Sequence, residues 1–500
     1  MSTDLPKQGQ GGMRPLDGDG GSDVKQFFFD VTNLRLYVAK RNRLSGIQRV
    51  TVMLIEHIAR QVGGNNVFLS FHDKKAKAYH AVSYETVEAL GGVLSADALT
   101  EALYRGQLAV NVRPTLRRYS QSPVKLAVHT AIREVNAMMG NRKHFEKRRT
   151  TLEAWKASAK KPKQHGSKTR SKEHFQDFSE VAKEGDCIIL ADAAWSVPLK
   201  RMEEAQARGI SCYFLIHDLI QIKAPELIGG TEQSLLFHAW LRKTMGFVDH
   251  YLANSEATAR DLREFLDAYG GNQEISVVSL AQAGVPVLPK AETEVATPTD
   301  INRDVYHKLA DSAGIKDDIR ALLKRPYVLC VGTMEARKNM WGLVQAWDRL
   351  RLCDGIELPK LVFAGNPGWL NQDFERFMAE TGNLYGWVEL VISPSDEELE
   401  FLYQNCLFSA MPSFFEGWGL PVGESLSYGK TAVVSQTSSL PEVGGDLVLY
   451  FDPHSISSIT SAIHRMINED GLRQRLESQI SQTPLRGWED VANDILKAIP

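Results

Sequence analysis

The chain has 500 residues, of which 43% are apolar and 24% are charged, and its formal net charge is −3. This length exceeds what one hydrophobic core usually holds, so two or three domains are expected. The composition is that of a soluble globular protein, and the near-neutral charge gives no reason to expect nucleic acid as a partner. No apolar run approaches the ~18–20 residues of a membrane span, and the polar, glycine-rich start does not resemble a signal peptide. A cytoplasmic protein is expected, one that can still lie at the inner face of the cytoplasmic membrane.

The first half of the chain predicts one α/β unit. Residues 1–24 are polar and glycine-rich and are expected to form a disordered arm. Short runs rich in β-branched and aromatic residues then alternate with helical patterns as far as residue 285. The strands are expected at 27–31, 187–190, 212–216, 250–254 and 275–280. Such alternation is typical of a parallel sheet with helices on both faces.

A second unit with the same rhythm is expected over 323–480, after a polar linker at 286–322. Helical patterns are expected at 339–351, between the first and second strands of this unit, and at 395–405, between the third and fourth. The strands are expected at 327–332, 361–365, 388–392, 407–411 and 431–435. The sequence therefore predicts an α/β fold with two doubly wound, Rossmann-like domains.

A basic segment interrupts the first unit. Residues 141–172 contain twelve Lys or Arg and two Glu. One interpretation is a solvated insertion, and the other is a patch for anionic lipid head groups or a polyanionic polymer. The segment shows no clear apolar face, so electrostatic docking is favoured over amphipathic insertion. No aromatic residues are interleaved in the manner of a nucleic-acid surface.

Ligands of open parallel sheets bind beyond the carboxyl ends of the strands, so the residues that follow each strand are candidates. In the first unit, Gly46 opens a probable helix, Asp192 follows one strand, and His217 and Asp218 follow the next. Asn254 closes a further strand. Asp192 and Asn254 are explained as easily by strand-end caps as by substrate contacts, and a lone histidine is as easily a packing residue.

In the second unit, Arg337 and Lys338 follow a strand and precede a helix that starts near Asn339. Cations beside the free N–H groups of a helix start suit a phosphate or diphosphate. The alternative is an ordinary basic pair on the surface.

The stretch "SFFEGWGLPVGESLSYGK" (413–430) places Glu416 and Glu424 eight positions apart around a glycine-rich turn. A carboxylate at the tip of the turn can accept hydrogen bonds from ligand hydroxyls, and the glycines let backbone amides approach the same ligand. Glu424, early in the following helix, can accept from a vicinal diol such as that of ribose. The alternative is a capped surface helix with two solvated glutamates.

These motifs resemble a known family. The E-x7-E pair inside "FFEGWGLPVGES" resembles the signature of retaining glycosyltransferases with the GT-B fold, and most closely glycosyltransferase family four. "VGTMEARKN" (331–339) and "SSLPEVGGDLVLYFDP" (438–453) are similar to blocks of the same family, as are "SGIQRV", "LIHDLI" and "LANSEATARDL" upstream. "GWEDVANDIL" looks like the family's final helix, which implies that 481–500 crosses back to the first domain.

The resemblance implies a role for each matching residue of the second domain. Arg337 and Lys338 would hold the nucleotide diphosphate, and Glu424 would bind the ribose hydroxyls. Glu416 would contact hydroxyls of the transferred sugar. The backbone of three further residues would approach that sugar, namely Gly417, Trp418 and Gly419.

The resemblance also implies roles in the first domain. His217 would face the anomeric centre or the hydroxymethyl group of the sugar. Gly46 would lie where a loop approaches the diphosphate, although many relatives carry two or three glycines there and this chain has "SGIQR". Asn254 is a substrate-binding candidate in the same domain.

The implied activity is retaining transfer of a hexose from a nucleotide sugar to a glycan or lipid-linked glycan in surface polysaccharide assembly. The forms "GTMEARKN" and "AGNPGW" look most like mannosyltransferases, which favours GDP-mannose as donor. Rhamnosyl or glucosyl transfer is the alternative, and a non-catalytic scaffold that docks on a membrane or partner is a second. No Asp-x-Asp pair follows a strand, so neither a metal nor another cofactor is expected, and the basic pair would neutralise the leaving group.

Overall fold

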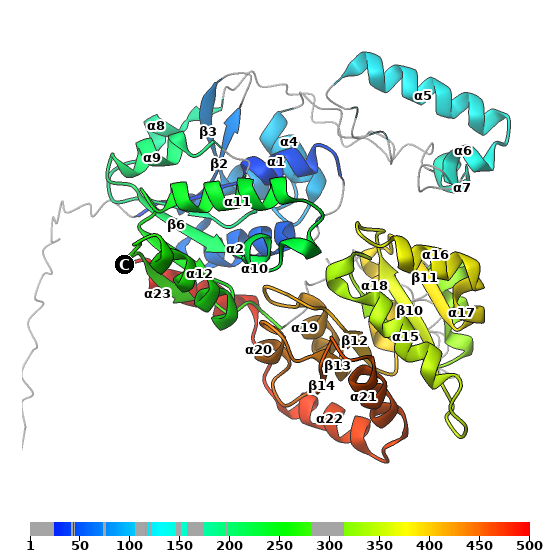
Figure 1. Cartoon of the computed structure of the whole chain (residues 1–500). Coiled ribbons are helices and arrows are strands. Elements are labelled where there is room, and N and C mark those ends of the chain that lie inside the picture. The colour runs from blue at the N-terminus through cyan, green and yellow to red at the C-terminus, as the bar shows by residue number, and fades with distance from the viewer. Residues whose placement is uncertain are drawn as a thin grey trace, which may run out of the picture.

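The computed structural model contains two β-sheets, one formed by each half of the chain. Helices flank both sheets (Figure 1). The residues that the structure describes are 25–41, 44, 46–73, 77–105, 116, 119, 122–146, 152–157, 175–193, 195, 198–282 and 315–500. The predicted arm at 1–24 lies outside these ranges, as does most of the predicted linker.

The first sheet has the strand order β4-β3-β2-β1-β5-β6-β7-β8. Its strands are β1 Phe27–Asp30, β2 Val67–Asp73, β3 Ala78–Ser83, β4 Gln176–Asp177, β5 Cys187–Leu190, β6 Ser211–Ile216, β7 His250–Ala253 and β8 Glu274–Val277. Strands β2, β1, β5, β6, β7 and β8 are parallel, as expected, and β3 and β4 are antiparallel additions at one edge. Strands β2, β3 and β4 were not predicted from the sequence. The edge strand β3 reads "AYHAVS", and its small and polar residues give no apolar run.

The second sheet is parallel throughout, with the order β11-β10-β9-β12-β13-β14. Its strands are β9 Tyr327–Val331, β10 Lys360–Gly365, β11 Val388–Ile392, β12 Ser409–Met411, β13 Ala432–Ser435 and β14 Leu449–Phe451. Five of the six were expected, and β14 was not predicted. The α/β class with two doubly wound sheets is confirmed.

Helices cover both faces of each sheet (Figure 1). The helices of the first half are α1 Thr32–Val38, α2 Ile47–Val62, α3 Tyr84–Glu88, α4 Ala96–Tyr104, α5 Pro123–Met138, α6 Arg142–Glu146, α7 Leu152–Ala157, α8 Phe178–Val181, α9 Lys200–Gln206, α10 Ile220–Lys223, α11 Thr231–Thr244 and α12 Glu256–Ala268. Those of the second half are α14 Asp317–Arg320, α15 Met340–Leu350, α16 Gln372–Glu380, α17 Gly382–Gly386, α18 Asp396–Asn405, α19 Leu420–Ser427, α20 Leu440–Gly444, α21 Ile456–Asn468, α22 Leu472–Gln482 and α23 Trp488–Ala498.

The last helix, α23, belongs spatially to the first sheet. It packs on α2, and Trp488, Val491 and Ile495 are buried in the core cluster that also contains Leu54 of α2. Figure 1 shows this red helix beside α12, next to the first sheet. The same cluster continues through Trp418 into the second half, so apolar packing joins the two units.

The described part of the predicted linker corrects one boundary. Residues 315–322 include α14, and both Ile315 and Ile319 are buried in a core cluster with Tyr327 and Leu402. These residues are therefore part of the second unit, because their side chains complete its core. Over the ranges that the structure describes, no helix has the length and hydropathy needed to cross a bilayer.

Candidate active site

A short 3-10 turn, η5 Ala336–Lys338, carries the two cations predicted from the sequence. It follows β9 and leads into α15. Asn339, in the left-handed region with φ 50°, caps that helix, and its side chain accepts a hydrogen bond from the N–H of Gly342 at 3.1 Å. The sharp change of direction between strand and helix turns both cationic side chains toward the glycine-rich loop at 413–419.

A buried ion network forms around Glu416. Lys338 Nζ lies 2.6 Å from Glu416 Oε1, and Arg337 Nη1 lies 2.6 Å from Glu416 Oε2. Arg337 also donates through Nε and Nη2 to Glu335 Oε1, at 3.0 and 2.7 Å. Lys338, Glu335 and Glu416 are all buried. Two cations thus balance two carboxylates in a site that has little contact with water.

This network determines the ionisation of Glu416. Burial by itself would raise the pKa of its carboxyl, but attraction to Arg337 and Lys338 outweighs burial and lowers the pKa to about 2. Glu416 is therefore ionised at every physiological pH. An anionic ligand that approaches the two cations must compete with this carboxylate for them.

Backbone contacts hold the loop that carries Glu416. Its N–H donates to Ser438 Oγ at 2.9 Å, and Ser439 Oγ donates to the carbonyl oxygens of Glu416 and Trp418, each at 2.9 Å. The N–H of Phe414 donates to the carbonyl of Arg337 at 2.9 Å, which fixes the loop to the cationic turn. The loop is therefore held in place by both the turn and the segment after β13.

Gly417 lies directly against the first unit. A Cβ atom added there would lie 1.8 Å from the carbonyl oxygen of His217, so only glycine fits against the first unit. The next residue, Trp418, is 5% exposed and donates through Nε1 to the carbonyl of Ala281 at 3.3 Å. Its side chain is a packing residue between the units. Gly419 adopts φ +111° and precedes α19.

Glu424 lies in α19 and faces the other unit. Its Oε1 pairs with Arg49 Nη1 of α2 at 3.2 Å, and its Oε2 accepts from the Tyr403 hydroxyl at 3.0 Å. Burial raises the pKa of Glu424, while Arg49 and Tyr403 act in the opposite sense. Neither partner was predicted from the sequence. Arg49 stands in the quoted motif "SGIQRV", three positions after Gly46, so the signal was present there.

In the first unit, His217 and Asp218 follow β6 and line a cavity of about 50 Å³. The walls of this cavity are Ile47, Asp192, Ala193, Trp195, Leu215, Ile216, His217, Asp218, Gln221, Phe237 and Trp240. Asp218 faces the second unit. Burial raises the pKa of its carboxyl, and the charge of Arg337 acts against that rise.

The ring of His217 has a defined hydrogen-bonding role. Its Nε2 lies 2.7 Å from the carbonyl oxygen of Ala191, and a carbonyl can only accept, so Nε2 carries the proton. Burial lowers the pKa of His217 to about 4. At neutral pH the ring is therefore uncharged, and Nδ1 is left as an acceptor.

Several polar atoms of the same cavity have no hydrogen-bond partner within the described residues. They are Asp192 Oδ2, Gln221 Oε1 and Trp240 Nε1. Burial raises the pKa of Asp192 to about 6, although the N–H of Ala193 and the Gln48 amide both donate to its Oδ1. Buried polar atoms without partners are costly, and these three belong to residues that line one cavity, where a ligand could pair with them.

The two remaining predicted residues lie outside the walls of this cavity. Gly46 is the N-cap of α2, with φ +51°, and its neighbour Ile47 contributes to the cavity. Asn254 is buried at the end of β7, and its Oδ1 has no hydrogen-bond partner. The structure does not bring Asn254 into the network of Arg337.

Further contacts between the units bring their sheet edges together. Glu442 of α20 accepts hydrogen bonds from the N–H groups of Glu256 and Ala257 at the start of α12, at 2.7 and 2.9 Å. The Gln282 amide donates to the carbonyl of Val443 at 2.6 Å. A carboxylate from one unit thus caps a helix of the other, where the helix dipole favours it.

No cluster of three or more metal-ligating side chains occurs in the described parts of the chain. Cationic side chains, an uncharged histidine and unpaired polar atoms instead meet where the carboxyl ends of strands from two sheets converge. This arrangement can bind an anion on the side of the second unit and hydroxyl groups on the side of the first.

The fold defines the class of protein. A solved structure of Anabaena Alr3699/HepE in complex with UDP and glucose aligns with a TM-score of 0.52 and 12% identity, over 95% of this chain and 99% of that chain. The two parallel-strand sheets are those of a GT-B glycosyltransferase fold, and the expected fold is confirmed. Residues 311–483 match the family "Glycosyl transferases group 1", so this part of the chain is a group 1 glycosyltransferase domain, as the motifs indicated.

Characterised relatives cover parts of the chain. O-antigen chain mannosyltransferase B of Escherichia coli is 35% identical over 173 residues, which are 34% of this chain and 45% of that protein. The serotype-specific mannosyltransferase WbdA of Escherichia coli is 24% identical over 283 residues, or 55% of this chain and 32% of that protein. The chain thus spans less than half the length of these relatives in the matched regions.

Proposed function

We propose that this chain is a retaining glycosyltransferase that moves a hexose, with mannose favoured, from a nucleotide-diphosphate sugar to a glycan acceptor. The observation that carries the proposal is the pair of cations, half-buried Arg337 and buried Lys338, held at a strand end beside the loop that meets His217 of the other unit. The match to group 1 glycosyltransferases and the similarity to mannosyltransferases support it.

Arg337 and Lys338 act on the leaving group. Negative charge grows on the nucleoside diphosphate as the glycosidic bond breaks, and cations already fixed in a dry site stabilise that charge without reorganisation. In the ligand-free network both cations are paired with Glu416. The diphosphate would displace the carboxylate, which is then free to accept hydrogen bonds from hydroxyls of the transferred sugar. Two cations that are already present make a metal ion unnecessary for this task.

The nucleoside would lie against α19. Glu424 is the carboxylate for the ribose hydroxyls, and its ion pair with Arg49 would have to open or shift to admit them. Tyr403, whose hydroxyl donates to the same carboxylate, keeps the side chain oriented during the exchange. GDP-mannose is the favoured donor because the named relatives are mannosyltransferases.

The acceptor would enter from the first unit. The cavity beside His217 offers Trp195 and Trp240 as apolar walls, and Asp192 Oδ2 and Gln221 Oε1 as unpaired acceptors for sugar hydroxyls. The acceptor hydroxyl attacks from the same face as the departing diphosphate, and its proton passes to a phosphate oxygen. His217 stays uncharged and accepts a hydroxyl of the donor sugar through Nδ1, so it orients the sugar without donating a proton.

The test is binding and turnover with defined nucleotide sugars. Calorimetry with GDP-mannose, UDP-glucose and GDP should give saturable binding to the purified chain, and NMR of the glycoside formed should show the donor's anomeric configuration. Arg337→Ala should weaken binding of the nucleotide diphosphate by about 10- to 100-fold, because it removes charge-assisted hydrogen bonds.

Arg351→Ala is the matched control, since Arg351 pairs with Asp348 in the same unit, near the end of α15. It should bind the nucleotide as the unaltered chain does. Equal affinity for Arg337→Ala and the unaltered chain would contradict the proposal, and so would a product of inverted configuration. Binding of nucleotide sugars without any transfer to a glycan would favour a non-catalytic role.

A further inference from the structure

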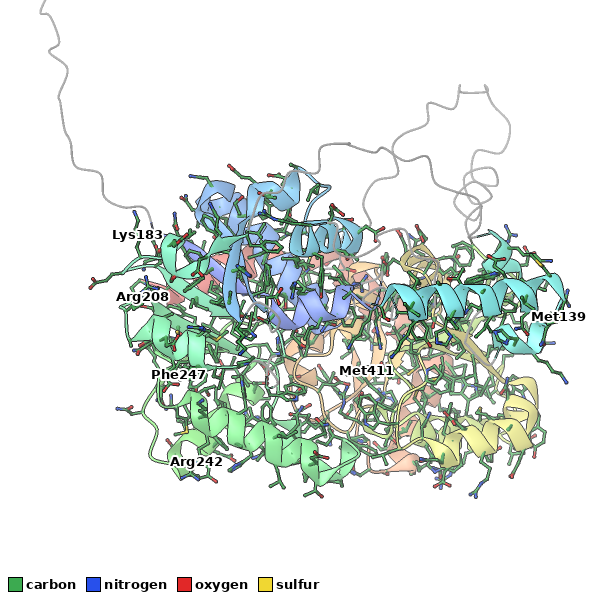
Figure 2. The ribbon with its side chains drawn as sticks, turned by 90° about the horizontal axis from the view of Figure 1, so that it is seen from above. Met139, Lys183, Arg208, Arg242, Phe247 and Met411 are labelled. Atoms are coloured by element: carbon green, nitrogen blue, oxygen red, sulfur yellow. The ribbon has the colours of Figure 1, made fainter. Side chains whose placement is uncertain are left out.

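Helix α5 stands apart from both sheets, at the outer side of the molecule (Figure 1). It forms a small cluster with α6 and α7, in which Ala137, Phe145, Leu152 and Trp155 are buried. Seen from above, Met139 marks the outer end of this helix (Figure 2). The group 1 domain at 311–483 does not include these helices, so the feature needs its own explanation.

The outward face of α5 is apolar. Its large exposed side chains are Val124 at 75%, Val128 at 51%, Ile132 at 41%, Val135 at 52%, Met138 at 84% and Met139 at 66%. Their spacing of three, four or seven positions places them on one stripe, together with the exposed Ala127 and Ala131. An exposed apolar stripe of this kind marks a surface that binds an apolar partner.

The inward face is the more polar one. It carries Arg133, which is 1% exposed and lies over the ring of Trp155 at 5.8 Å. Thr130 and Asn136, on the same side, donate to the backbone of the helix itself. A helix that folded only to stabilise its cluster would bury the valine stripe and expose Arg133. The reversed orientation therefore indicates that the stripe has a partner other than the residues that the structure describes.

The charges around the stripe identify the partner. Exposed cations flank it at both ends, with Lys125 in the first turn and Arg142 and Lys143 just after the last, and Lys156 is exposed on α7. Arg142, Lys143 and Lys156 belong to the basic segment 141–172, whose sequence has twelve basic residues in all and two glutamates. An apolar stripe between cations complements a bilayer surface with anionic head groups.

A second copy of the chain fits less well. Antiparallel pairing of two α5 helices would bring Lys125 of one beside Arg142 and Lys143 of the other, and parallel pairing would align identical cations. Like charges that meet at the rim of a contact oppose it. A lipid surface instead supplies the opposite charge to every one of these residues.

We propose that α5 lies in the interface of an anionic lipid bilayer, with the stripe Val124–Val128–Ile132–Val135–Met138–Met139 buried among the acyl chains. The flanking cations contact the head groups. The sequence alone favoured purely electrostatic docking through 141–172, because that segment has no apolar face of its own. The helix immediately before it supplies one, and its length of about 24 Å suits a helix that lies parallel to the membrane.

The experiment is flotation of the full chain with vesicles of phosphatidylcholine that contain phosphatidylglycerol. The variant Val128→Ser/Val135→Ser/Met138→Ser should lower the partition coefficient by about tenfold or more, since it removes three apolar side chains from the interface. The matched control is Leu235→Ser/Leu236→Ser, which alters two exposed leucines of α11 and should bind as the unaltered chain does. Thermal midpoints equal to that of the unaltered chain show that both variants are folded.

A second variant separates the electrostatic contribution to vesicle binding from the contribution of apolar burial. Arg142→Gln/Lys143→Gln should weaken binding by roughly fivefold for each charge removed on vesicles with phosphatidylglycerol, and should change little on phosphatidylcholine alone. The proposal is overturned if the unaltered chain does not float with anionic vesicles, or if the stripe variant floats equally well. It is also overturned if the stripe variant only converts a dimer to a monomer in solution, because the partner would then be a second copy.

Discussion

Replacing Glu416 by glutamine removes the carboxylate that joins Arg337 to Lys338. The pKa of Glu416 is lowered from 4.5 to about 2, which corresponds to about 3 kcal/mol of stabilisation at neutral pH. Glu416→Gln should lower the free energy of unfolding of the second unit by about this amount, because it leaves Arg337 and Lys338 without their shared partner. The same change removes the competitor of a phosphate ligand, so affinity for inorganic pyrophosphate should rise by about tenfold or more.

The sign of the pH dependence follows from the lowered pKa. The stabilisation by Glu416 is complete above the unfolded pKa of 4.5 and is lost as the pH falls toward 2. Urea unfolding at pH 7 should therefore separate the variant from the unaltered chain, and the difference should shrink below pH 4.5. Calorimetry with pyrophosphate at pH 7 measures the second effect.

The control is Glu389→Gln. Glu389 pairs with Lys360 at 2.6 Å and its side chain is 39% exposed, so its loss should cost less than about 1 kcal/mol. The reasoning is refuted if Glu416→Gln unfolds like the unaltered chain at pH 7. It is also refuted if this variant binds pyrophosphate more weakly, because the carboxylate would then assist the phosphate site instead of competing for its cations.

Two further predictions concern the first unit and its contact with the second. Asp192→Asn should raise the free energy of unfolding at pH 7.5 by up to about 3 kcal/mol, because burial raises the pKa of Asp192 from 3.8 to about 6 and ionisation of the buried carboxyl costs stability. Urea unfolding from pH 3 to 8 should show that this gain disappears below pH 3.8. A gain that does not depend on pH would contradict the reasoning. Gly417→Ala should force the units apart, because its Cβ would lie 1.8 Å from the carbonyl oxygen of His217. Turnover should fall by about 100-fold and the radius of gyration in X-ray scattering should increase, whereas Gly230→Ala, with open space around it, should change neither.

Much of the second unit was predictable because its signals are local. Apolar runs of β-branched residues identified β9 to β13, and the turn after β9 placed Arg337 and Lys338 at a strand end. The rule that ligands bind at the carboxyl ends of parallel strands then brought the cations and Glu416 to one sheet edge. Each step needs only periodicity and chain direction, which the residues themselves carry.

The predictions were wrong or incomplete where the sequence signal was weak, or where it was divided between segments far apart in the chain. Strand β3 was missed because an antiparallel edge strand needs no continuous apolar run, and its partner β2 was missed with it. The predicted linker extended too far toward the second unit, because Ile315 and Ile319 look like isolated apolar residues in the sequence until the core that they complete is known. Arg49 was not predicted as a site residue because its partner, Glu424, is 375 positions away in the chain.

The sequence by itself determined the two α/β units, the cationic turn and the pair of glutamates, because strand periodicity and turn chemistry depend on neighbours in the chain. Only the tertiary structure decided that Glu416 pairs with both cations, that Gly417 meets the carbonyl of His217, and that the apolar stripe of α5 faces outward. These features depend on distances between segments far apart in the chain, and on which face of a helix the rest of the molecule leaves uncovered.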